Sequence, residues 1–154
     1  MTKKNKKVVI GGTFDILHKG HKELLRKAFQ LGKVKIGLTS DKMAKRFKKR
    51  KINNFKKRKK ELENFIKKEF SQKAEIRKIE DKFGFAIKEK FDYIVVSPET
   101  FRTALLINKE RKKKNKGPIK IIKVKFILAK DKKPISASKI STGSMDKHGR
   151  LLIK

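Results

Sequence analysis

The chain has 154 residues, the usual length of a single domain, and no cysteine, which excludes a disulfide scaffold, thiol catalysis and a cysteine-ligated zinc site. Lysine and arginine outnumber aspartate and glutamate by 47 to 15, so the formal net charge is +32. A charge of this size attracts polyanions, but 39 of the basic residues are lysines, whereas direct readers of bases favour arginine; we therefore expect nucleic-acid binding to be non-specific at most.

The hydrophobic pattern switches repeatedly between strand-like and helix-like spacing. Five alternations predict an α/β fold, a Rossmann-like five-stranded parallel sheet with helices on both faces. We expect one domain over residues 1–154, with a peripheral tail beyond about residue 146. The predicted strands are 8–10, 34–38, 74–79, 92–96 and 119–128, and the predicted helices are 19–31, 55–70 and 99–115, with a short helix or turn at 83–90 and a short helix near 138–143.

Two further expectations concern the core and the compartment. In the helix over residues 99–115, the apolar spacing predicts a core stripe of Phe101, Ala104, Leu105 and Asn108. No apolar run approaches the roughly 18 residues of a membrane span, and the run after the basic N-terminus is too short for a signal peptide. We therefore expect a soluble, cytoplasmic protein.

Ligands of parallel α/β sheets bind beyond the carboxyl ends of the strands. The loop after the first predicted strand places Gly11 and Gly12 before a pair of histidines, His18 and His21, where the first helix should begin. Glycines let backbone N–H groups approach a phosphate, and a helix N-terminus adds positive potential. The imidazoles could donate hydrogen bonds to phosphate oxygens as charge develops. A metal site is disfavoured because no acidic third ligand is apparent, so no metal-ligating residue is predicted.

Two segments resemble the signatures of the nucleotidyltransferase superfamily, which includes adenylyl- and cytidylyltransferases. Residues 12–21 (GTFDILHKGH) resemble the first signature, and residues 134–141 (PISASKIS) resemble the second. Residues 36–44 (IGLTSDKMA) and 94–100 (IVVSPET), together with Ile107, Asn108 and Arg111, resemble the archaeal type of phosphopantetheine adenylyltransferase. The resemblance implies transfer of AMP from ATP to 4′-phosphopantetheine, which gives dephospho-coenzyme A and pyrophosphate.

The resemblance also implies catalytic residues. His21 would contact the α-phosphate in the transition state, with His18 in a similar phosphate-contacting role. Lys42, or else Lys45, would bridge the donor and acceptor phosphates. We expect the basic segment 42–51 to form a mobile flap that polyphosphate orders, because like charges repel and few apolar residues anchor it.

Substrate-binding residues are implied in the same way. The second signature departs from the family pattern at Ala137, Ser138, Lys139 and Ser141, so its phosphate grip would depend on lysine and hydroxyls rather than on arginine. Magnesium should arrive with ATP, held mainly by phosphates and water. The implied binding residues are Gly12, Thr13 and Phe14 in the first loop, Ser97 and Glu99 beside the ribose and adenine, and Ser136, Ser138 and Lys139 at the β- and γ-phosphates.

Other assignments remain open at this point. For Asp15 we favour bracing of the glycine turn over metal ligation, and we do not expect Arg58 to be catalytic. The alternatives to the pantetheine branch are a sister transferase, such as an FAD synthetase or a cytidylyltransferase, and a non-enzymatic RNA- or nucleotide-binding protein on the same fold. No apolar interface is readable, so the sequence predicts no oligomeric state.

Overall fold

The computed structural model describes residues 6–47 and 51–125. Within them lie five strands and four helices, in an order close to the predicted alternation. The elements are β1 (Lys7–Gly12), α1 (Lys19–Leu31), β2 (Lys33–Thr39), α2 (Asp41–Phe47), α3 (Phe55–Phe70), β3 (Glu75–Ile79), β4 (Tyr93–Val96), α4 (Phe101–Lys113) and β5 (Lys120–Lys123).

All strand pairs are parallel, and the strands are ordered β3-β2-β1-β4-β5. The chain builds the sheet outward from β1 through β2 to β3, and then returns to the other side of β1 to add β4 and β5. The direction of building therefore reverses between β1 and β4. A crevice opens at such a point because the loops that follow the two strands diverge to opposite faces.

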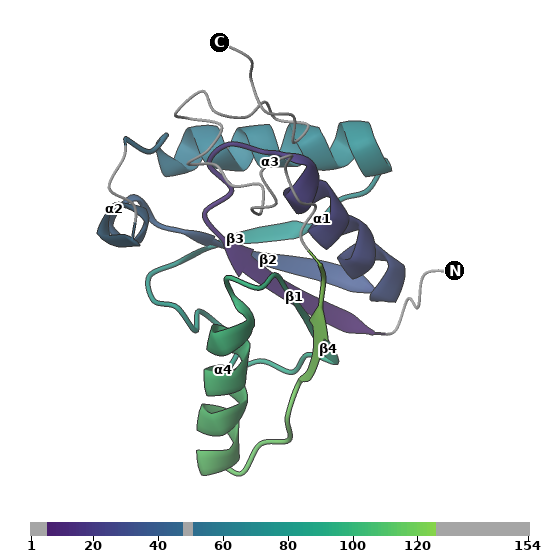
Figure 1. Ribbon diagram of the computed structural model, residues 1–154, viewed down its shortest axis with the longest axis vertical. Helices are drawn as coiled ribbons and strands as arrows, with labels where there is room; N and C mark the ends of the chain where they lie inside the picture. Colours follow the sequence, from purple (N-terminus) through teal and green to yellow (C-terminus); the bar gives the residue numbers. More distant parts are fainter. Residues whose placement is uncertain (1–5, 48–50, 126–154) are drawn as a thin grey trace.

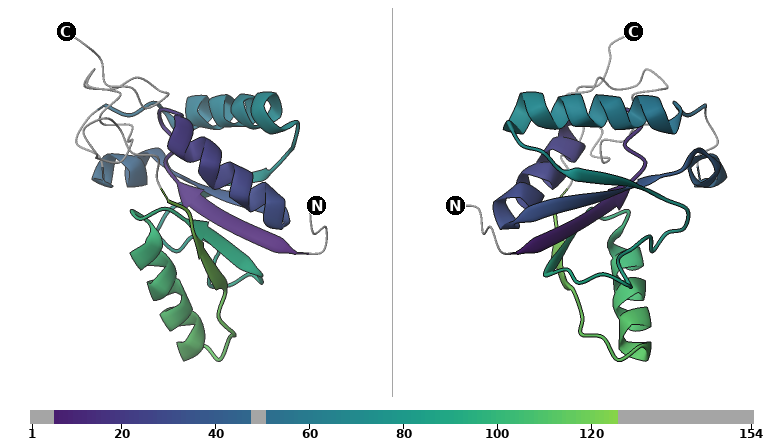
Figure 2. Two further views of the ribbon diagram at one scale, coloured as in Figure 1. Left: turned by 45° about the vertical axis from the view of Figure 1, so that its right-hand side comes forward. Right: turned by 180° about the vertical axis from the view of Figure 1, so that it is seen from behind.

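The two faces of the sheet carry separate hydrophobic clusters, because successive side chains of a strand point to opposite sides. Val8 and Ile10 of β1 pack under α1 and α3, whereas Val9 packs on the α4 side. Figures 1 and 2 show α1 and α3 together on one face and α4 alone on the other. The prediction of a parallel sheet covered on both faces is thus confirmed.

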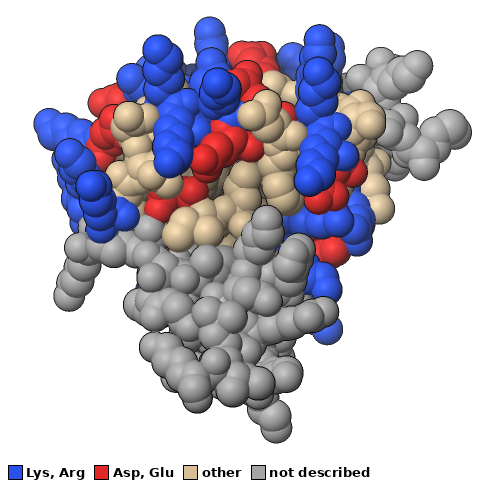
Figure 3. Space-filling view, turned by 90° about the horizontal axis from the view of Figure 1, so that it is seen from above, with Lys and Arg blue, Asp and Glu red and all other residues tan. Residues whose placement is uncertain are grey.

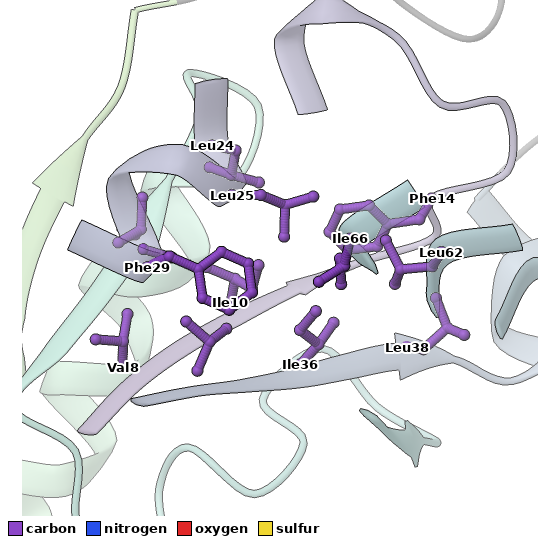
Figure 4. Packing of buried hydrophobic residues seen from close by; sticks show 13 residues of the cluster. Val8, Ile10, Phe14, Leu24, Leu25, Phe29, Ile36, Leu38, Leu62 and Ile66 are labelled. Atoms are coloured by element: carbon purple, nitrogen blue, oxygen red, sulfur yellow. The ribbon is translucent and has the colours of Figure 1, made fainter. Parts of the chain in front are cut away.

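The α1/α3 face has the larger core. Leu25 of α1 and Leu62 of α3 meet Ile36 of β2 in a closely packed layer, and all three are fully buried. Phe14 joins this layer from the loop after β1, beside Leu62 and Ile66 (Figure 4). The first loop is therefore anchored in the core by one aromatic ring.

The predicted stripe of α4 is wrong in part. Ala104 is buried as expected, but Leu105 is 49% exposed, and Ile107 and Arg111 are buried instead. Positions 104, 107 and 111 follow the three-and-four spacing of one helix face, whereas 105 lies about 100° away from 104.

Strand β5 is also shorter than predicted, since its ladder spans Lys120–Lys123. Residues 126–128 of the predicted strand, the short helix near 138–143 and the tail beyond 146 lie outside the described residues. Among the described helices, none is both long and apolar enough to cross a membrane.

Candidate functional site

A pocket of about 380 Å³ opens at the reversal point between β1 and β4. The loop after β1 and the loop after β4 meet there, as expected for the carboxyl end of the sheet. The structure brings together seven of the sequence-predicted site residues as lining of this pocket: Gly12, Thr13, Phe14, His18, His21, Ser97 and Glu99.

The glycine turn after β1 is required by the ring of Phe14. Phe14 is buried and has a positive φ of 47°, so the chain reverses sharply at this residue. A Cβ atom on Gly12 would lie 3.0 Å from Cε2 of the Phe14 ring, closer than an ordinary van der Waals contact. Gly12 thus allows the ring to pack against the backbone of the turn.

The two histidines form the N-terminal cap of α1. Nδ1 of His18 accepts a hydrogen bond from Gly20 N at 3.1 Å, and Nδ1 of His21 accepts one from His18 N at 3.3 Å. The rings stack with centroids 3.9 Å apart, and the ring of Phe14 lies 5.0 Å from that of His21. This is a reciprocal capping box built from two imidazoles.

The cap sets the tautomer of both rings. An imidazole nitrogen that accepts a backbone N–H carries no proton, so the neutral forms of His18 and His21 bear their proton on Nε2. His18 and His21 both line the pocket, next to the positive end of the helix dipole. This arrangement suits a phosphate whose negative charge increases during a reaction.

Arg58, at the start of α3, ties the first loop to the end of β2. Its guanidinium is fully buried and donates to Thr13 O, Asn53 O and the hydroxyl of Thr39 at 2.8–3.2 Å. Nη2 also pairs with Asp41 at 3.1 Å. These donors of Arg58 are thus directed at protein groups.

Thr39 extends this network to the pocket. Its hydroxyl accepts from Arg58 and donates to the hydroxyl of Thr13 at 3.1 Å. The Thr13 hydroxyl consequently acts as the acceptor in this pair and has its own proton to donate elsewhere. Thr39 was not among the predicted site residues, although it directly follows the second predicted strand.

Asp15 braces the loop against the segment before α3. Its side chain is buried, and Oδ1 accepts from Asn53 N at 2.9 Å. In the described part of the chain, no group of three or more histidine, cysteine, aspartate or glutamate side chains could hold a metal ion. A Mg²⁺ ion would therefore fit this pocket only if phosphate and water supplied most of its ligands.

The loop after β4 forms a tight turn before α4. Ser97 is buried, and its N–H donates to the hydroxyl of Thr100 at 3.1 Å, while Thr100 N donates back to Ser97 O. Glu99 is exposed at the pocket rim. Residues 82–86 and Thr103, Ala104 and Ile107 of α4 also line the pocket, which the sequence did not predict.

The predicted lysines lie apart from this group. Lys42 and Lys45 are exposed on α2 and do not line the pocket. Within α2, Met43 and Ala44 are buried, and Met43 N donates to the Ser40 hydroxyl, while the mobile flap over residues 42–51 stays a prediction. Ser136, Ser138 and Lys139 lie outside the described residues, as do Ala137 and Ser141.

Comparison with known proteins agrees with this geometry. A family model described as cytidylyltransferase-like matches residues 9–143. A phosphopantetheine adenylyltransferase of Methanosarcina mazei is 46% identical over 150 residues, which cover 94% of this chain and 96% of that protein. One of Archaeoglobus fulgidus is 40% identical over 148 residues, 95% of this chain and 99% of that protein.

A solved structure shares the fold. It is a protein of unknown function from Archaeoglobus fulgidus, 39% identical, with a TM-score of 0.74 over 77% of this chain and 88% of that one. The family match covers both the glycine turn and the histidine pair, and the strand order places them at the expected end of the sheet. The chain belongs to the cytidylyltransferase-like family of nucleotidyltransferases.

Proposed function

We propose that this protein is a phosphopantetheine adenylyltransferase, which transfers AMP from ATP to 4′-phosphopantetheine and releases dephospho-coenzyme A and pyrophosphate. Near-full-length relatives with this name support the substrate pair. The observation that carries the chemistry is the stacked pair of His18 and His21 capping α1 beside the glycine turn.

The reaction needs no nucleophile from the protein. An oxygen of the acceptor phosphate, already anionic at neutral pH, attacks the α-phosphorus of ATP. The bond from this phosphorus to the bridging oxygen breaks, and its electrons leave with pyrophosphate. Catalysis then consists of in-line positioning and stabilisation of charge.

We assign the stabilisation of charge to the first loop. The Nε2–H groups of His18 and His21 would donate to the oxygens of the α-phosphate, which gain negative charge in the transition state. The Thr13 hydroxyl would donate to the acceptor phosphate, since Thr39 already donates to it.

The two walls of the pocket suit different parts of the substrates. We assign the ribose and adenine to the Ser97–Glu99 turn. We assign the uncharged, partly apolar pantetheine arm to the apolar part of the lining, which includes Phe83, Phe85 and Ile107. Lys42 or Lys45 of α2 would reach the polyphosphate, and Ser136, Ser138 and Lys139 would hold its β- and γ-phosphates. Magnesium would enter with ATP and neutralise phosphate charge.

A non-enzymatic nucleic-acid-binding role is less favoured. On the face that includes α3, lysine and arginine are interspersed with aspartate and glutamate (Figure 3), and α3 itself contains Glu61, Glu63 and Glu69 among its lysines. Such a face lacks the single-sign stripe of a dedicated polyanion site. Any RNA binding should therefore fall steeply with salt.

The test is pyrophosphate release with a panel of acceptors. With ATP and Mg²⁺, release should require phosphopantetheine and should be negligible with FMN or glycerol phosphate. Replacement of ATP by CTP should abolish most of it. A preference for FMN, or for CTP as donor, would instead assign the protein to an FAD synthetase or a cytidylyltransferase.

A further inference from the structure

The part of the pocket that we assign to the pantetheine arm of the acceptor includes an irregular segment. Residues 80–92 connect β3 to β4 without forming a helix or a strand, and residues 82–86 line the pocket. Only short-range turns close the segment internally, among them Ala86 N to Phe83 O and Glu89 N to Phe85 O, both at 3.0 Å. Contacts from outside the segment must therefore fix its position.

Three of these contacts come from one arginine at the end of α4. Arg111 is 6% exposed, and its Nη1 donates to the carbonyl oxygens of Ala86, Ile87 and Glu89 at 2.9–3.2 Å. Its Nε donates to Gly117 O at 2.8 Å. Among the described residues no carboxylate pairs with Arg111, so backbone carbonyls alone compensate the burial of its charge.

A second cation reaches the same strip of backbone. Nζ of Lys116 donates to Ile87 O at 3.2 Å and to Lys88 O at 3.1 Å. The backbone N–H of Lys116 in turn donates to Arg111 O at 2.8 Å, which fixes the position of one residue relative to the other. Together they bind four consecutive carbonyl groups, from residue 86 to residue 89.

The segment is also attached to the sheet. Lys35 of β2 pairs with Glu89, and its Nζ lies 4.5 Å from the centroid of the Phe85 ring. Gly84, with φ of +53°, sits directly on Ile79, where a Cβ would come within 2.7 Å of Cγ2. The segment is thus clamped between β2 and α4, and α4 also supplies Ala104 and Ile107 to the same pocket.

We propose that Arg111 is a positioning residue for acceptor recognition. With Lys116 it sets the distance between residues 82–86 and α4, and so the width of the part of the pocket that contacts the acceptor. Arg111 is not among the residues that line the pocket, so its loss should act through the wall and weaken acceptor binding more than nucleotide binding or the chemical step. This inference rests on the proposed function for the identity of the acceptor, but the clamp itself does not.

The test compares Arg111→Met, Arg111→Lys and Lys116→Met with Lys112→Met, which removes a charge from an exposed position on the same helix end. Arg111→Met should raise KM for phosphopantetheine by roughly tenfold or more, because hydrogen bonds from a charged donor to several carbonyls are lost. KM for ATP and kcat should change by less than about twofold. Arg111→Lys should recover part of the loss, and Lys112→Met should match the unaltered protein.

Amide hydrogen exchange provides a readout that is independent of turnover. In Arg111→Met and Lys116→Met, the amides of Gly84, Ala86 and Glu89 should exchange faster, whereas those of β1 and α1 should not change. If Arg111→Met fails to fold, the more exposed Lys116→Met decides, with an expected rise of roughly threefold in the acceptor KM.

Two outcomes would overturn the proposal: equal rises in both KM values, or unchanged exchange in the 80–92 segment of a folded variant. Failure of the proposed function would look different, because the unaltered protein would then release no phosphopantetheine-dependent pyrophosphate. The hydrogen-exchange measurement would still decide whether Arg111 holds residues 80–92 in place.

Discussion

Replacing His21 separates a capping role from a catalytic one. His21→Ala removes the acceptor of His18 N–H and the ring that stacks on His18 at 3.9 Å. Loss of a cap costs about 1 kcal/mol, and loss of an aromatic pair costs about 0.5–1.5 kcal/mol. The free energy of unfolding should therefore fall by roughly 1.5–2.5 kcal/mol, which lowers Tm by about 3–10 °C for a chain of this size.

The rate should fall much further than this change in stability implies. An oxyanion-type donor contributes roughly 10²–10³ in kcat. His21→Ala should lose about that factor, with KM for ATP changed far less, because the Nε2–H donor acts mainly on charge that develops in the transition state. Steady-state kinetics and thermal melting of the same preparation measure both quantities.

Two variants make this prediction sharper. His21→Glu supplies the usual third residue of a capping box, so it should recover about 1 kcal/mol of stability while it remains at least as inactive, because a carboxylate cannot donate. Asn54→Ala removes the cap of α3, where Asn54 accepts from Lys57 N, and should lose about 1 kcal/mol with little change in kcat. If His21→Ala turned over as fast as Asn54→Ala, the catalytic assignment would be wrong.

Three further predictions follow from the described contacts. Arg58→Met should destabilise the protein by roughly 3 kcal/mol in denaturant unfolding, since it leaves Thr13 O and Asn53 O without their donor. Lys60→Met, at an exposed position, should change the free energy of unfolding by less than about 0.5 kcal/mol, and similar losses in both variants would contradict the network around Arg58. Gly84→Ala should cost roughly 1–3 kcal/mol because of its positive φ and the contact with Ile79, whereas Gly117→Ala, with nothing within 4 Å, should be nearly neutral in the same melts. EDTA should abolish turnover but leave the Tm of the ATP-free protein unchanged; a lower Tm would reveal a resident metal.

The regular elements could be predicted because their apolar residues follow the period of each element. In α1, Leu24, Leu25, Ala28 and Phe29 lie on one helix face, and the predicted range agrees with the observed Lys19–Leu31. The glycine turn and the histidine pair were predicted for a related reason, since a strand that ends in glycines before a helix start is a local pattern.

The buried arginines were not predicted, because a hydrophobic pattern treats every arginine as surface. The spacing nevertheless held a signal. Arg58 lies four residues before Leu62 and eight before Ile66, and Arg111 lies four after Ile107, each on the buried face of its helix. An arginine that continues an apolar stripe is a candidate for a buried hub that binds backbone carbonyls.

The turns at residues 83–90 could be predicted, but the place of residues 82–86 in the pocket wall could not. No periodicity marks the segment 80–92, and its place over the sheet depends on partners far away in the sequence, such as Lys35 and Arg111. Loops of this kind take their position from long-range contacts rather than from local propensity.

Phosphorus NMR of a complete reaction mixture tests the central claim most directly. With ATP, Mg²⁺ and phosphopantetheine, the monoester signal of the acceptor should disappear as diphosphate signals of dephospho-coenzyme A and the signal of free pyrophosphate rise in equal amounts. An acceptor monoester that persists while ATP is converted to ADP and phosphate, or to AMP, would contradict adenylyl transfer to phosphopantetheine.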